Sequence, residues 1–307
     1  MPNPRILDKR RRSIRNIRKI TRTMELIATA RFKKAMDRAS AATAYTNRIT
    51  QLVRDLMESG LEVKHPLLEP RDSVQNATLL VLTANRGFCG GFNGNVIRAA
   101  FNRWLELQQT VPNCRLEISG KKGQTSFKTR GIATAASFSQ FDDRPAFDEV
   151  DCIASRYLEE YATGRLDRLD VVYTKFVSVA RQHVTIETLL PLSAVAGPAG
   201  ESSGQTRGAQ VGHDPAAANG RRAIYEFLPS PESILEEVVP TSFKIKLFKC
   251  FLDSAVSEQI ARMVAMKSAT ENAGDLIHRL SMQYNRARQG RITSELMDVI
   301  GGVEALS

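Results

Sequence analysis

The sequence predicts an α/β protein in which a long antiparallel coiled coil of the N- and C-terminal helices carries a mostly parallel-sheet α/β globular domain. Three observations lead to this prediction. No Gly or Pro interrupts the chain between Arg5 and Ser59, and a heptad pattern runs through most of that stretch. A second heptad pattern lies near the C-terminus. Between the two, short apolar runs alternate with helical stretches, as in folds with a parallel sheet.

The N-terminal heptad positions step alternately by three and four residues, which keeps one stripe of a helix against a partner helix. They are Ile14, Ile17, Thr21, Met24, Ala28, Arg31, Ala35, Arg38, Ala42, Tyr45, Ile49, Leu52 and Leu56. The C-terminal positions are Met263, Met266, Thr270, Ala273, Ile277, Leu280, Tyr284 and Ala287. A helix of about 50 residues is about 75 Å long, well beyond the width of a globular domain. Two such helices from opposite ends of the chain predict a shaft.

The predicted domains are an N-terminal coiled-coil helix (1–60), an α/β globular domain (74–230) and a C-terminal coiled-coil helix (241–307). In the globular domain we expect strands at 77–83, 116–119, 170–177 and 184–189, the last as a hairpin partner, and helices at 95–109, after 120–123 and at 147–163. Residues 196–222 are rich in Gly and polar residues and predict a mobile loop insertion. Pro229, Pro231 and Pro240 are expected to bracket a short helix, with the long C-terminal helix beginning near Ser242. Gly274 and Gly290 should bend that helix without breaking it.

Charge is concentrated at the beginning of the chain. The 307 residues carry a formal net charge of +10. Between Arg5 and Arg38 there are 13 Lys or Arg residues against Asp8, Glu25 and Asp37. A solvated helix face is the ordinary explanation for a charged run, but a local bias of one sign also favours an acidic partner. The chain lacks an apolar run long enough for a membrane span and begins without a secretory signal pattern, so we expect a soluble, cytoplasmic protein.

The sequence indicates no cofactor or metal site. Cys89, Cys114, Cys152 and Cys250 are far apart and predict buried, reduced thiols. The four His residues have no metal-ligand spacing.

A glycine-rich turn follows the first expected strand, at 85–94. Such a turn can bind phosphate, which would make the chain a small nucleotide-binding α/β enzyme. Its glycines fit neither of the two common phosphate-binding motifs, so a structural turn is favoured. The basic first helix leaves open a second alternative, a basic coiled-coil nucleic-acid-binding protein. No aromatic residues alternate with its charges for base stacking, and no catalytic constellation is visible anywhere, so an enzyme is the weakest class.

Three motifs resemble the γ subunit of F-type ATP synthase, the central rotor stalk. The first is the segment from Lys19 to Thr29, and the second is the turn from Asn85 to Asn93. The third comprises Ser257-Glu258, Ala261 to Lys267, Tyr284 to Gln289, Ile292-Thr293 and Gly301-Gly302. The resemblance covers nearly the whole chain, and the motifs lie at its two ends and at the turn with the spacing of the family.

The resemblance implies a non-catalytic subunit of a proton-translocating ATP synthase, without a cofactor of its own. Its two terminal helices would enter the catalytic hexamer of α and β subunits, and the globular domain would sit with ε against the membrane c-ring. Rotation of the ring would be coupled through the shaft to ATP synthesis or hydrolysis. Nucleic acid would not be a partner. The protein would be peripheral, at the cytoplasmic face of the bacterial inner membrane.

The resemblance also implies three contact regions. Met24, Arg288 and Gln289 match rotor–hexamer contacts, and Tyr225 and Glu226 fall near the contact of the foot with the c-ring. The apical bearing tip would be formed by apolar residues after Arg291, namely Leu296, Met297, Val299, Ile300, Val303 and Leu306. The family's Asp at the glycine turn is Asn85 here, which would weaken any charge-assisted contact made there. The 196–222 loop lies where photosynthetic relatives carry a thiol-regulated insertion, but it has no Cys, so disulfide switching is not expected.

Overall fold

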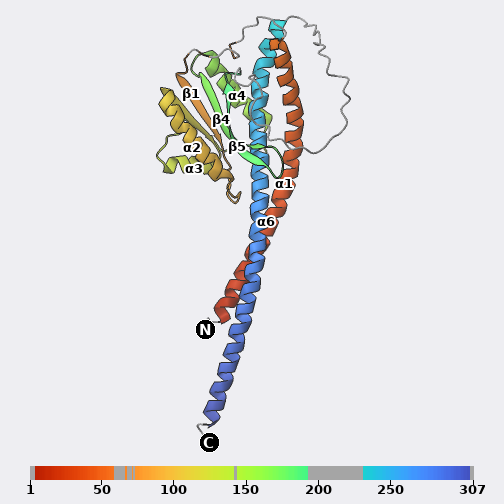
Figure 1. Ribbon diagram of the computed structural model, residues 1–307, viewed down its shortest axis with the longest axis vertical. Helices are drawn as coiled ribbons and strands as arrows, with labels where there is room; N and C mark the ends of the chain where they lie inside the picture. Colours follow the sequence, from red (N-terminus) through yellow and green to blue (C-terminus); the bar gives the residue numbers. More distant parts are fainter. Residues whose placement is uncertain are drawn as a thin grey trace, which may run out of the picture.

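The computed structural model describes residues 4–58, 66–67, 71, 73–141, 144–192 and 231–304. Two very long helices, α1 (Pro4–Glu58) and α6 (Pro231–Glu304), form a shaft along the long axis of the molecule (Figure 1). The α/β domain lies to one side of the shaft, at the end away from the two termini (Figure 1). The 74 residues of α6 correspond to about 110 Å at 1.5 Å per residue. Because α1 is shorter, α6 runs on past its N-terminal end (Figure 1).

The globular domain has a five-stranded sheet in the order β3-β2-β1-β4-β5. Its strands are β1 (Asn76–Leu82), β2 (Asn113–Ser119), β3 (Ala136–Phe138), β4 (Arg168–Phe176) and β5 (Gln182–Leu190). β1 pairs in parallel with β2 and β4, and β2 in parallel with β3, whereas β5 is antiparallel to β4. The mostly parallel sheet and the hairpin partner are therefore as the sequence predicts. The short edge strand β3 was not predicted.

Helices cover both faces of this sheet. On one face lie α2 (Phe92–Thr110) and α3 (Lys121–Thr129), and the other face packs against α4 (Phe147–Ala162) and α6. Successive side chains of β1 point to opposite faces of the sheet, so this strand contributes to the hydrophobic core on each face. Leu79 and Val81 belong to the core on the α2 side, and Leu80 and Leu82 to the core on the α4 side. α6 thus belongs both to the core of the domain and to the shaft.

The predicted heptad stripe of the C-terminal helix agrees with the structure, since all eight of its positions are buried or half-buried. In α1, eight of the ten heptad positions whose burial is described are buried or half-buried. Thr21, Ala28 and Ala35 face α6, but Ile17 is 47% exposed and Arg38 is exposed. Glu25, which follows Met24, and Ala39, which follows Arg38, are buried. Several apolar side chains of α1 are exposed, so hydrophobicity alone does not single out the positions of the stripe that stay unburied. The side chains of Tyr45, Leu52 and Leu56 lie outside the described residues.

The expected break before the C-terminal helix is also wrong. α6 begins at Pro231 and continues through Pro240 as one helix. Pro240 cannot donate a backbone hydrogen bond to the carbonyl of Glu236, which costs an isolated helix about 3 kcal/mol. Burial of the helix on both sides of Pro240, at Val239 and Phe243, offsets that cost. The helix also continues through Gly274 and Gly290, as predicted.

Candidate functional site

The shaft is held by small side chains and by isolated polar contacts. Ala35 and Ala39 of α1 are buried against Leu252, Val256 and Ile260 of α6. Small residues let the two helix backbones approach closely, so a narrow rod can form without large apolar side chains. Further along, Thr270 Oγ1 donates to Thr21 Oγ1 at 2.8 Å. Residue numbers rise along α1 while those of their partners fall along α6, so the helices are antiparallel.

Near the N-terminal end of α1, a cation–π contact joins the two helices of the shaft. The guanidinium of Arg11 lies over the ring of Tyr284 at 4.7 Å and also pairs with Asp8 at 2.7 Å. Ala287, one turn further along α6, is the last buried residue of that helix among those described. From residue 291 to residue 303 every side chain is exposed. The shaft therefore ends as a single helix.

That single-helix end is apolar. Leu296 is 57% exposed and Val299 64%, and Ile300 and Val303 are exposed as well. Met297 and Ile292 add to the same surface, while Leu306 lies outside the described residues. Exposed apolar surface on one contiguous element is a feature of interaction sites. Among the described residues, therefore, the predicted tip side chains from Leu296 to Val303 are not buried by packing.

The predicted hexamer contacts lie at separate levels of the shaft. Met24 is half-buried and is three residues from the Thr21–Thr270 pair, whereas Arg288 and Gln289 are exposed near the beginning of α1. The rise of an α-helix puts these two levels about 30 Å apart. Arg288 also lines a cavity of about 330 Å³ with Arg5 and Asp8 of α1. Tyr225 and Glu226, the predicted foot, lie outside the described residues, as does the 196–222 loop.

The glycine-rich turn connects the domain to the shaft. An ideal Cβ on Gly90, whose φ is +55°, would lie 3.8 Å from the Cβ of Ala265 in α6. Arg262 of α6 donates from Nε to the carbonyl of Gly87 at 3.5 Å, and Asn93 Oδ1 accepts from the backbone N–H of Ala84 at 2.9 Å. The turn therefore packs against α6 at the carboxyl end of β1, the central strand of the sheet. Its structural role, favoured from the sequence, agrees with this geometry.

Asn85 is suited to its place in a way that Asp would not be. Its side-chain Nδ2 donates to the carbonyls of Ser139 and Phe141, each at 3.0 Å, and its Oδ1 accepts from the backbone N–H of Lys121 at 3.1 Å. A carboxylate could accept the last of these bonds but would repel the two carbonyl oxygens. The weakening expected from the loss of the family's Asp is therefore offset by two bonds that only an amide can donate. Sequence reasoning missed this role because residues 139–141 are far away along the chain.

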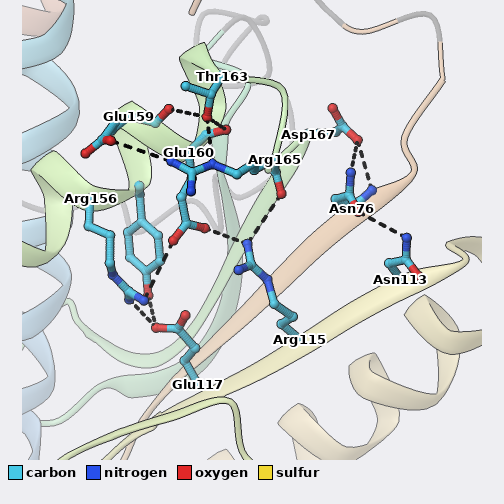
Figure 2. A network of polar contacts seen from close by, with 11 residues as sticks. Asn76, Asn113, Arg115, Glu117, Arg156, Glu159, Glu160, Thr163, Arg165 and Asp167 are labelled. Carbon is cyan, nitrogen blue, oxygen red and sulfur yellow. Dashed lines mark hydrogen bonds and ion pairs between the residues drawn. The ribbon is translucent and has the colours of Figure 1, made fainter.

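A buried polar network fixes α4 to the sheet (Figure 2). Glu117 of β2, which is 1% exposed, accepts from Arg156 at 2.5 Å and from the Tyr157 hydroxyl at 2.8 Å. Arg115 pairs with Glu160 one turn further along α4 (Figure 2). Burial, with the nearby Glu117 carboxylate, raises the pKa of Tyr157 well above its usual value, so its hydroxyl stays protonated and donates. Sequence analysis did not predict this network, because its partners are far apart along the chain. Its hydrogen bonds and ion pairs hold α4 against β2 and have a structural role.

A second polar cluster lies where α6 meets β4 and β5. The hydroxyl of Tyr173 donates to Glu187 at 2.6 Å, and Asp253 of α6 is 3% exposed with Lys249 Nζ at 3.8 Å. Burial raises the pKa of Asp253 to about 6, against attraction from Lys249 and Lys175. Among the residues that the structure describes, Asp253 Oδ2 has no hydrogen-bond partner, since the Lys249 distance is that of an ion pair only.

All four cysteines are free thiols, but their burial differs from the prediction. Cys89 and Cys250 are buried, Cys114 is half-buried and Cys152 is exposed. Burial raises the pKa of Cys114 to about 11 and also raises that of Cys89 and Cys250. Cys152 is exposed because it lies on the outer face of α4, whose inner face carries the buried Ile153 and Tyr157. Within the described part of the chain, none of the helices is both long and apolar enough to cross a membrane.

These features define a class of protein before any comparison. A rigid antiparallel two-helix shaft, with an α/β domain on its side and a bare apolar end, is the architecture of a stalk subunit that acts inside a larger assembly.

Comparison with known proteins gives the family. A family model described as ATP synthase matches residues 3–306. The ATP synthase gamma chain of Rhodopirellula baltica is 60% identical over 306 residues, which cover 100% of this chain and 99% of that protein. The ATP synthase gamma chain of Leptospira biflexa is 36% identical over 307 residues, with full coverage of both. The chain therefore belongs to the ATP synthase gamma chain family.

Solved structures agree in fold. A chain in the cryo-EM structure of the Euglena gracilis mitochondrial ATP synthase rotor, in rotational state 1, is 19% identical with a TM-score of 0.60, over 94% of this chain and 98% of that one. A chain in the rotational state 3 structure of OSCP, F1 and the c-ring from the same organism gives a TM-score of 0.62 at 20% identity, over 99% of this chain and 94% of that one. The long shaft with its lateral domain is thus a shared fold at low sequence identity.

Proposed function

We propose that this chain is the central rotor shaft of a proton-translocating F-type ATP synthase. It couples rotation of a membrane c-ring to ATP synthesis or hydrolysis in a hexamer of α and β subunits. The observation that carries the proposal is the unpaired apolar end of α6 beyond Ala287. An apolar surface makes no directional ion pairs that would have to break at each step, so it can turn inside an apolar collar. Family membership supports the same assignment.

In this proposal the shaft has three working levels. Leu296, Val299, Ile300 and Val303 form the apical bearing, and Arg288 and Gln289 engage the hexamer just below it. Met24 meets the hexamer about 30 Å further down the shaft. The exposure of all but Met24, which is half-buried, supports these roles, because their side chains extend from the shaft instead of packing within it. Tyr225 and Glu226 are proposed for the c-ring contact on the resemblance alone.

The chain contributes no catalytic residue of its own in this proposal. Its basic excess lies on α1, where 13 Lys or Arg residues are found between Arg5 and Arg38. These cations could face acidic loops of the surrounding subunits. Such exposed pairs are individually weak and screened, so they can break and form again as the shaft turns. The ε subunit is proposed to join the globular domain near the ring. The working location is the cytoplasmic face of the bacterial inner membrane, where the protein is held peripherally through the complex.

Coupling through Arg288 and Gln289 can be tested in a reconstituted complex with a double variant, Arg288→Ala with Gln289→Ala. Removing two exposed side chains should leave the shaft folded, because neither is buried. We expect proton pumping per ATP hydrolysed to fall several-fold, measured by dye quenching in vesicles alongside ATPase assays.

The matched control is Arg98→Ala with Gln108→Ala, which removes the same side chains from the exposed face of α2. It should leave the pumping-to-hydrolysis ratio unchanged. An unchanged ratio in the shaft variant would contradict the assigned contact.

A further inference from the structure

We propose that a cavity at the junction of α1, β4 and α6 is a binding site for a small, neutral aromatic alcohol. This inference does not depend on the proposed function. The cavity has a volume of about 410 Å³, which lies within the range of ligand pockets in proteins. Its lining comes from residues 36–43 of α1, from residues 176–177 at the end of β4 and from residues 249–253 of α6, and the structure describes each of these segments.

The first observation is a buried carboxylate in the wall of the cavity. Asp253 lines the cavity and is 3% exposed. Among the described residues its Oδ2 has no hydrogen-bond partner, and Lys249 Nζ at 3.8 Å makes only an ion pair with it. A buried carboxylate oxygen without a donor is unfavourable, and a ligand that brings a donor removes this cost. The last torsion of an Asp side chain is broad, so the carboxylate can turn an oxygen toward the cavity.

The nearby hydroxyl of Thr43 does not supply the missing donor. Its Oγ1 donates to the carbonyl oxygen of Ala39 at 2.7 Å, so its proton is used within α1. Its oxygen remains an acceptor in the lining of the cavity. Ser40 and Val177, which also line the cavity, are exposed, so a ligand can enter from solution on their side. Two acceptors, on Thr43 and Asp253, therefore favour a ligand that donates a hydrogen bond.

The charges around Asp253 favour a neutral donor over a cation. Lys249 and Lys175 attract the charge of its carboxylate. The carboxylate of Glu187 repels it. The local charges therefore already balance, and a cationic ligand would have to enter beside two ammonium groups. A hydroxyl group avoids this, because it can donate to the carboxylate and accept from Lys249 at the same time.

The remaining lining indicates the body of the ligand. Met36, Ala39, Phe176 and Val177 are all apolar. A methionine sulfur and a phenylalanine ring both make favourable contacts with an aromatic ring. Met36 and Phe176 also pack against the buried cluster that joins α1 to α6, to which Ala39 belongs. These walls are thus positioned before a ligand arrives, so little free energy is spent on ordering them.

Benzyl alcohol is the probe for this site, and the methyl group of Met36 is the reporter. The full chain is labelled with ¹³C at its methionine methyl groups and titrated with benzyl alcohol by NMR. We expect a saturable shift of the Met36 resonance with a millimolar dissociation constant, as is usual for so small a ligand. The resonances of Met266 and Met282, which lie further along α6 outside the cavity lining, should stay in place.

The hydroxyl group is tested with anisole, an isomer of benzyl alcohol that has the same ring but no O–H. Because it has no proton to donate to Asp253, anisole should bind about tenfold more weakly. Benzylammonium should also bind more weakly than benzyl alcohol, since it meets Lys249 and Lys175. Equal or tighter binding of either compound would overturn the assignment of a neutral donor.

The carboxylate is tested with Asp253→Asn, which keeps the shape of the side chain and removes its charge. Its affinity for benzyl alcohol should fall about tenfold, whereas its affinity for anisole should stay within about twofold. Asp298→Asn, the same substitution at an exposed position on α6, is the matched control and should bind benzyl alcohol as the unaltered chain does. No saturable shift of Met36 up to tens of millimolar benzyl alcohol, or equal losses in the two variants, would overturn the proposal. A loss confined to Asp253→Asn and to the alcohol would establish the site.

Discussion

The two ends of α6 differ in how deeply their side chains are buried. Between Val239 and Ile260 most of its side chains are buried against the sheet, α4 or α1. Beyond Ala287 the same helix has no buried residue among those described, although its composition is still apolar. One continuous element is thus the core of a domain at one end and a bare surface at the other. Buried and exposed apolar side chains are therefore separated along the length of one helix.

The largest effect that this comparison predicts is on stability, at the buried end. Phe243 is 0% exposed and belongs to the cluster that joins α6 to the sheet and α4. Phe243→Ala should lower the free energy of unfolding by about 3–5 kcal/mol, through lost burial and the cavity left behind. Urea unfolding followed by circular dichroism measures it.

The control lies on the same helix at the other end. Val303 is 66% exposed, and Val303→Ala should change stability by less than about 0.5 kcal/mol. Similar losses in the two variants would mean that the ends of α6 are not the separate regions described above.

The comparison also shows why the sequence predicted one stretch of the shaft better than the other. In α6 the heptad residues from Met263 to Ala287 do face α1, so the apolar pattern and the packing agree. In α1, Ile17 and Ile27 are about half exposed while Glu25 is buried. A pattern of hydrophobicity does not tell which partner a side chain faces. From the sequence pattern alone, apolar residues that would contact another subunit cannot be distinguished from those that pack within the chain.

In the globular domain the strands and helices could be predicted because their signals are local. Apolar runs such as 79–82 and turns at glycine define β1 and α2 from neighbouring residues alone. The site geometry could not be predicted, because Asn85 meets Ser139 and Glu117 meets Arg156 across long stretches of sequence. Pro240 misled the prediction for a related reason, since tertiary burial offset a local penalty.

A smaller effect concerns the buried carboxyl of α6, and it depends on pH. Burial raises the pKa of Asp253 to about 6 in the folded protein, above its ordinary value of 3.8. Between these pH values the folded state binds more protons than the unfolded state, so this group makes stability fall as pH rises from about 4 to about 6. Above about pH 6 the loss is complete and constant. The side chains that act on it are Lys249 of α6, Lys175 of β4 and Glu187 of β5.

Asp253→Asn removes this ionisation. We expect the variant to be more stable than the parent by about 3 kcal/mol at neutral pH, with the difference vanishing below about pH 4. Urea unfolding at several pH values measures both. A variant that is less stable at neutral pH would show that the attraction of Lys249 outweighs burial. Asp298→Asn, the same substitution at an exposed position on the bare end of α6, is the matched control.

The smallest effect on stability is predicted where the effect on function should be large. Ile300 is 50% exposed at the bare end of α6, so Ile300→Asp should change the free energy of unfolding by less than about 0.5 kcal/mol. In the assembled complex the new carboxylate would have to enter an apolar collar without a partner, which is unfavourable. We therefore expect ATPase activity and rotation of the reconstituted complex to fall several-fold.

Leu105→Asp is the control, since Leu105 is 43% exposed on α2, away from the shaft. It should leave ATPase activity and rotation unchanged. Full activity with Ile300→Asp would show that the bare end of α6 turns in water and not against apolar surface, and its exposed Leu and Val side chains would then need another explanation.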